Sequence, residues 1–152
     1  SFHVTGLQNC YFPKLVGIGG FAFQECQIKE LNSNSFPSLE VVEYQGFSQC
    51  PITSVNLPSL VSIGEEGFEG CENLRHFSAQ KLQEIGDNCF SNCLRLNNIN
   101  CDLEPKKFIC NGCHQCPVCY YDIEACLQRG RSGEPVEEVE VDHETLDGVL
   151  KK

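Results

Sequence analysis

Residues 60–71 read Leu60-Val-Ser-Ile63-Gly-Glu-Glu-Gly-Phe68-Glu-Gly-Cys71, and this stretch is one of four copies of a single motif. The motif is Leu-x-x-Ile-x-x-x-x-Phe-x-x-Cys, with Val in place of Ile in one copy. The copies begin at Leu15, Leu39, Leu60 and Leu82, which lie 24, 21 and 22 residues apart. Repeats of this length, each of which buries its apolar face only against its neighbours, are typical of solenoids. The sequence therefore predicts a short stack of β-rich repeats.

A second apolar pattern follows each motif and predicts a short strand. It reads apolar-x-x-apolar-x-small-or-apolar, as in Ile52, Val55 and Leu57, and is the strand pattern of leucine-rich repeats. Because side chains alternate across a strand, the intervening residues point outward, where successive turns align them in columns. We predict that these columns bind the ligand. Their members are Lys29, Glu30, Asn32, Thr53, Ser54, Asn56, Arg75, His76, Ser78, Asn97, Asn98 and Asn100.

At these residues the chain resembles the BspA-like, or Treponema-type, leucine-rich repeats. The resemblance rests on residues 63–71, on the preceding link Leu57-Pro58-Ser59-Leu60, and on Ile85-Gly86 with Phe90-x-x-Cys93 in the next copy. It covers roughly residues 15–101. The resemblance implies a right-handed, curved solenoid with a role in adhesion or protein recognition at the surface of bacteria and mucosal protist parasites. It implies no catalysis.

The repeated Phe and Cys residues are predicted to be core. Free Cys is among the most buried residue types, so a ladder of apolar thiols is favoured over a thiol site. Cys89 has no counterpart in the other copies and is a candidate for pairing outside the ladder. The two predicted ladders are Phe23, Phe47, Phe68 and Phe90, and Cys26, Cys50, Cys71 and Cys93.

His76, with Glu30, Ser54 and Ser78, is the nearest approach to a catalytic set. General acid–base catalysis needs such groups within hydrogen-bond reach and inside a cleft that shifts their pKa values. The face of a short solenoid is open to water, so we expect no enzymatic activity and interpret His76 as a solvated residue or a binding contact.

A second informative stretch is Cys110-Asn-Gly-Cys113-His-Gln-Cys116-Pro-Val-Cys119, flanked by Cys101 and Cys126. Its two Cys-x-x-Cys pairs look like zinc knuckles, but zinc sites usually separate their pairs by a longer loop. One ion held by both pairs is therefore awkward, although either pair can act with Cys101, Cys126 or His143. An iron–sulfur cluster ranks lowest, because the ferredoxin run has three residues before its last Cys and this one has two.

Disulfide bonds are the third interpretation, and we favour them slightly over zinc. Cys-dense segments commonly close the ends of extracellular domains that are too short to build their own core. Six cysteines form an even set and allow about fifteen pairings, so the connectivity cannot be deduced. No cofactor other than zinc is indicated. The six residues of this metal or disulfide site are Cys101, Cys110, Cys113, Cys116, Cys119 and Cys126.

The chain divides into four predicted segments. A short helix is expected over residues 122–130, with Asp122 as its N-cap and Gly130 at its end. The segments are an N-terminal cap or partial repeat over 1–14, the repeats over 15–101, a Cys-rich C-terminal cap over 102–130 and an acidic tail over 131–152.

The net charge and the hydropathy of the sequence limit the classes of partner and location that fit the protein. The net charge is −10 over 152 residues and the basic residues form no stripe, which disfavours a nucleic-acid partner. No apolar run reaches the length of a membrane span. The sequence predicts a non-enzymatic recognition or adhesion module that binds a protein or a glycan, located outside the cell or on its surface. The alternatives are a cytoplasmic scaffold subunit with a zinc-binding Cys cluster and a disulfide-linked wall or coat protein.

Overall fold

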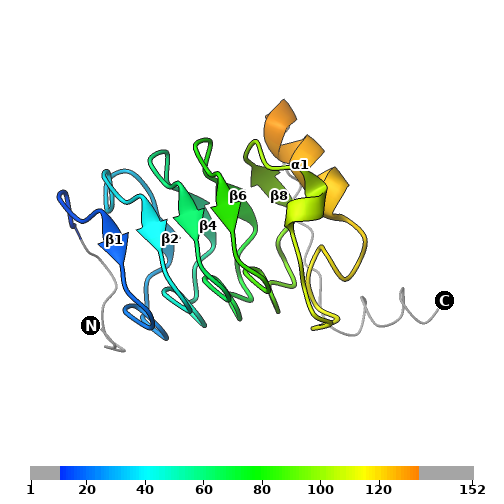
Figure 1. Ribbon diagram of the computed structural model, residues 1–152, viewed down its shortest axis with the longest axis horizontal. Helices are drawn as coiled ribbons and strands as arrows, with labels where there is room; N and C mark the ends of the chain where they lie inside the picture. Colours follow the sequence, from blue (N-terminus) through cyan, green and yellow to red (C-terminus); the bar gives the residue numbers. More distant parts are fainter. Residues whose placement is uncertain (1–10, 134–152) are drawn as a thin grey trace.

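A computed structural model describes residues 11–133 of the chain. Eight short strands alternate there between two parallel sheets, so the chain winds as a β-solenoid of about four turns (Figure 1). This architecture confirms the predicted repeat stack. One sheet has the order β1–β3–β5–β7, with bounds Gly17–Ile18, Val41–Val42, Ser62–Ile63 and Glu84–Ile85. The other has the order β2–β4–β6–β8, with bounds Glu30–Leu31, Ser54–Asn56, His76–Ser78 and Asn98–Asn100.

The strands are short because each turn contributes only one inward side chain per sheet. In the second sheet Leu31, Val55, Phe77 and Ile99 occupy equivalent positions on neighbouring strands, and all four are at most 2% exposed. Each turn therefore buries its apolar residues against the turns on either side. This is the packing that the repeat period predicts.

The Phe ladder is confirmed and runs one step further than the repeats counted in the sequence. Ring centroids of Phe23, Phe47, Phe68 and Phe90 follow one another at 5.4, 5.5 and 6.0 Å. Phe108 stacks on Phe90 at 6.3 Å, so the first part of the Cys-rich segment continues the core. At the other end Phe12 stacks on Phe36 at 5.6 Å. The remainder of the predicted N-terminal cap and nearly all of the acidic tail lie outside the described residues.

The Cys ladder is also buried as predicted. The thiols of Cys50, Cys71 and Cys93 each donate to a Phe carbonyl of the preceding turn, at sulfur–oxygen distances of 3.0, 3.2 and 3.1 Å. Burial raises the pKa of Cys50 from 9.0 to about 12 and raises those of Cys71 and Cys93 as well. These side chains act as small core residues with a weak donor.

The buried thiols make the stability of the fold sensitive to alkali. A folded-state pKa above the unfolded value stabilises the fold fully below pH 9.0, and this contribution is lost as the pH rises through about 12. We therefore expect the free energy of unfolding, measured with urea, to fall steadily above pH 9.0. The Cys50→Ala variant has one such thiol fewer, so its free energy of unfolding is expected to fall less steeply. Equal slopes for the two proteins would contradict this account.

Two further elements follow β8, namely the 3-10 helix η1 (Pro105–Lys107) and the helix α1 (Ile123–Ser132). The prediction that Gly130 ends this helix is wrong, because α1 continues to Ser132 and its C-cap is Gly133, which adopts φ +69. Asp122 occupies the N-cap position without a capping hydrogen bond. Its carboxylate instead binds the Arg129 guanidinium at 2.8 Å.

Helix α1 covers the outer edge of β8, where the next turn would pair (Figure 1). Arg129 Nε donates to the carbonyl of Asn97 at 2.6 Å, and Arg131 Nε donates to that of Cys101 at 3.0 Å. Between them Gly130 brings the helix backbone directly against the carbonyl of Ile99. Unpaired strand edges are sites of unwanted association, and here the helix covers the edge and two guanidinium groups satisfy its carbonyls.

Candidate functional site: the polar strand face and the four-cysteine cluster

Eleven of the twelve predicted ligand-binding residues stack in three columns, all except Asn32, and we call the full set of twelve the polar face. Glu30, Ser54, His76 and Asn98 occupy equivalent positions on successive strands. Asn56, Ser78 and Asn100 form a second column in the same way. A third column lies just before the strands and contains Lys29, Thr53, Arg75 and Asn97. Backbone hydrogen bonds connect its members, since each N–H from Thr53 onward donates to the carbonyl of the preceding member.

Not every member of the polar face is equally free to bind. The side-chain oxygen of Asn32 accepts a hydrogen bond from the backbone N–H of Asn34 at 2.9 Å, so it shapes the turn. The side-chain oxygen of Asn97 is buried and lacks a hydrogen-bond partner among the described residues. Asn97 is half-buried and this oxygen is out of reach of a partner, whereas the side chains of Glu30 and Thr53 are exposed. The sequence pattern alone could not separate these positions.

His76 does not lie in a catalytic arrangement. Its side chain is half-buried in the sheet, and among the described residues nothing forms a hydrogen bond or ion pair with it. The described pockets lie elsewhere, one beside the Cys-rich segment and the other at the opposite end around Phe12. Neither of these two pockets is lined by residues of the polar face.

The Cys-rich segment gathers four thiols at one point. The Sγ atoms of Cys110, Cys113, Cys116 and Cys119 all lie within 4.8 Å of one another, and those of Cys113 and Cys119 are 3.8 Å apart. Four sulfurs at about 2.3 Å from a tetrahedral zinc ion are separated by about 3.8 Å. The cluster therefore has the size and donor set that a single thiophilic metal ion needs. The four cysteines of this cluster are free thiols and form no disulfide bond with one another.

This geometry differs from the expectation that two closely spaced Cys-x-x-Cys pairs are awkward ligands for one shared ion. Two residues in the left-handed region reverse the chain at once, Gly112 with φ +99 and His114 with φ +63. The backbone N–H of Gln115 then donates back to Cys113 Sγ at 3.2 Å. A loop of only two residues thus turns both pairs toward the same point.

The surroundings of Cys110 favour the thiolate form of this cluster residue. Burial raises the pKa of Cys110, but hydrogen bonds from the backbone of Cys113 and Gly112 and from the side chains of Cys113 and Cys119 together outweigh it, so the pKa is lowered to about 7. Cys116 is buried more deeply, and its pKa is raised by burial and by the neighbouring thiols. Metal ligation requires deprotonated Cys, and hydrogen bonds to the sulfur help to stabilise that form.

Cys101 and Cys126, the other two members of the predicted six, lie outside this group of sulfurs. Cys126 belongs to α1, and its thiol contacts Leu96 O at 3.8 Å and the carboxylate of the N-cap residue Asp122 at 3.5 Å. Cys101 is buried where Arg131 reaches the end of β8. Sequence reasoning missed the role of the two arginines, since their spacing gains meaning only once α1 lies on β8.

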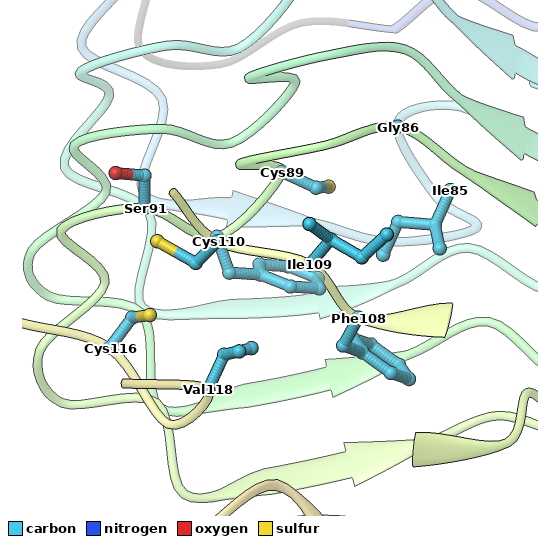
Figure 2. A pocket seen from close by; sticks show the side chains of 10 residues that line it. Ile85, Gly86, Cys89, Ser91, Phe108, Ile109, Cys110, Cys116 and Val118 are labelled. Carbon is cyan, nitrogen blue, oxygen red and sulfur yellow. The ribbon is translucent and has the colours of Figure 1, made fainter. Parts of the chain in front are cut away.

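A small cavity separates the last full turn from the Cys-rich segment (Figure 2). Cys110 and Cys116 lie at one end of it, near Ser91, whereas Ile85 and Phe108 lie at the other. Cys89, the thiol without a counterpart in the repeats, is buried in its wall. The volume of the cavity, about 10 Å³, is at the lower limit for one water molecule, so the cavity holds no small-molecule substrate.

The chain belongs to the BspA type leucine rich repeat region family. The family model matches residues 1–116 in six copies, which extends the repeats beyond the four that the motif marks. No curated protein and no solved structure matches the chain. Membership places the protein among interaction or recognition modules, which are typically not enzymes and are typically associated with surfaces. Within residues 11–133 no helix has the length and apolarity needed to cross a membrane.

Proposed function

We propose that this protein is a non-enzymatic recognition module that binds a protein partner through its polar face. The observation that carries the proposal is the register of the second sheet, which places Glu30, Ser54, His76 and Asn98 side by side. Adjacent strands in a sheet lie about 4.8 Å apart, so these side chains offer closely spaced donors and acceptors that one partner can contact together. A glycan is the other partner that this chemistry suits.

The first sheet supplies a matched control, because Ser62 and Glu84 form an equivalent column on β5 and β7. We expect His76→Ala/Asn98→Ala to weaken binding at least about tenfold and Ser62→Ala/Glu84→Ala to leave it unchanged, since truncating a central contact typically costs more than 1 kcal/mol. Binding is measured against immobilised extracellular proteins and against a glycan array. Equal affinities for both double variants on every bound probe would rule out the polar face as the site.

The cell surface is the location that the family favours, and we propose adhesion there as the role of the module. A second candidate is an intracellular scaffold subunit whose Cys cluster holds zinc. The specific observation in its favour is the gathering of four free thiols within 4.8 Å, because structural thiols persist unpaired in reducing compartments. Both candidates use the polar face for recognition, and they differ in the chemistry of the C-terminal cap.

We propose zinc as the ion for this cluster, since four thiolates in a closed tetrahedron are typical of structural zinc sites. Intact-mass measurement of the native protein is expected to show one zinc ion, which a chelator removes. The cluster cysteines then react with iodoacetamide without prior reduction. Elemental analysis that finds iron in place of zinc would overturn the choice of metal. Cysteines that react only after reduction would establish disulfides and support an extracellular cap.

A further inference from the structure

One column of backbone N–H groups links each turn of the solenoid to the next. Glu25, Gln49 and Gly70 occupy equivalent places, and all three adopt a left-handed backbone with φ between 59° and 73°. Their N–H groups donate to carbonyl oxygens one turn ahead, with nitrogen–oxygen distances of 2.9, 2.7 and 2.8 Å. Every turn thus depends on its successor for an acceptor at this position.

The fourth member of the column is Asn92, with φ +61, and its acceptor is not a carbonyl group. Its backbone N–H points to Cys113 Sγ at 3.4 Å. Gln115 donates to the same sulfur at 3.2 Å, so Cys113 accepts two backbone N–H groups. A thiolate is a strong acceptor for N–H groups, whereas a neutral thiol is a weak one.

We propose that a zinc-bound thiolate of Cys113 serves as the final acceptor of the solenoid, so that the metal centre replaces the missing next turn. This inference rests on the zinc proposed above for the cluster. The ion keeps the sulfur deprotonated, and the charged sulfur then accepts the N–H of Asn92 as a carbonyl does in the earlier turns. The metal centre therefore terminates the repeat stack at this edge.

The segment that connects the cluster to α1 extends the ordering effect of the metal to β8, at the edge of the second sheet. The backbone N–H of Tyr120 donates to the carbonyl of Cys116 at 3.0 Å, and that of Asp122 donates to the carbonyl of Pro117 at 2.8 Å. Helix α1 starts at the next residue and covers the β8 edge. Zinc binding consequently orders both ends of the last turn, the loop edge through Cys113 and the strand edge through α1.

The start of the segment does not depend on the metal. The backbone N–H of Asn88 donates to the carbonyl of Ile109 at 2.7 Å, and the Asn88 side chain accepts the N–H of Asn111 at 2.7 Å. Phe108 is stacked on Phe90 as well. Removal of the ion is therefore expected to loosen the chain from Cys113 onward while the contacts of Asn88 persist.

The test is amide hydrogen exchange by NMR on the full chain, compared between the zinc-loaded and the chelated protein. A hydrogen bond to a charged group is worth enough that its loss raises exchange about tenfold or more. We expect such a rise at Asn92 and Gln115 and none at Gly70, whose acceptor is the carbonyl of Ser91. In protein loaded with cadmium-113, the amide protons of Asn92 and Gln115 are expected to show scalar coupling to the metal.

The possible failures are distinguishable. A protein that binds one zinc ion through the four cysteines, yet shows neither coupling nor altered exchange at Asn92, keeps its metal centre and overturns the inference about its role. A protein that takes up no metal overturns both. Cys126→Ser serves as the control variant, because this thiol lies outside the cluster and its substitution is expected to preserve both zinc uptake and the exchange difference at Asn92.

Discussion

Substitution of Gly130 by alanine is expected to destabilise the protein by about 1–3 kcal/mol, the usual cost of forcing extra atoms into a closely packed contact. A Cβ atom at this position would lie 2.0 Å from the carbonyl oxygen of Ile99 and 2.6 Å from the backbone nitrogen of Asn100. Neither is a flexible side chain that can move aside. The helix must therefore shift away from β8, which lengthens the Arg129 and Arg131 hydrogen bonds to the strand edge.

The expected loss of stability is opposite in sign to the usual effect of replacing glycine by alanine in a helix. In a solvent-exposed helix interior, glycine-to-alanine substitution stabilises by roughly 0.5–1 kcal/mol. Urea unfolding of Gly130→Ala is to be compared with that of Gln128→Ala, which alters an exposed position of the same helix. We expect a loss for the first and almost no change for the second. A Gly130→Ala protein as stable as the wild type would show that α1 does not pack on the β8 edge.

The sequence was sufficient to predict the repeat stack because its signal is local and repeated. Each copy places an apolar residue where the turn before and the turn after also place one, so Phe47 and Phe68 could be paired without knowledge of the structure. The columns of the polar face follow from the same register. The burial of the Asn97 side-chain oxygen could not be predicted, because Asn97 belongs to the last turn, where Arg129 of α1 binds its backbone carbonyl.

The C-terminal cap was harder to predict because its geometry depends on backbone conformation. Ligand spacing in Cys-x-x-Cys pairs argues against a shared ion only if the intervening loop is extended. His114 adopts a left-handed conformation, which turns the loop back and removes that constraint. Because this conformation is uncommon for residues other than glycine, it could not be predicted from the sequence. Gly130 was misread for a related reason. Glycine near the end of a helix commonly marks its C-cap, but here the absent side chain permits close approach to β8.

The Phe68→Ala variant carries the largest expected loss, about 3–5 kcal/mol, which is the usual cost of deleting a buried aromatic side chain. The Phe68 ring is fully buried and contacts three others, with centroids at 5.5 Å for Phe47, 5.5 Å for Phe77 and 6.0 Å for Phe90. Urea or thermal unfolding monitored by circular dichroism measures the loss. Phe68→Leu keeps most of the apolar volume and is expected to lose markedly less.

The central position of Phe68 in the stack explains why its substitution is expected to cost so much stability. In a solenoid each repeat is stabilised by its two interfaces, so damage at a central repeat weakens contacts on both sides. Phe21 provides the contrast, since it is 44% exposed and, within residues 11–133, its ring pairs only with that of Tyr44, at 5.2 Å. We expect Phe21→Ala to lose less than about 1 kcal/mol, as exposed substitutions usually do. Similar losses for Phe21→Ala and Phe68→Ala would mean that the aromatic stack is not the continuous core of the solenoid.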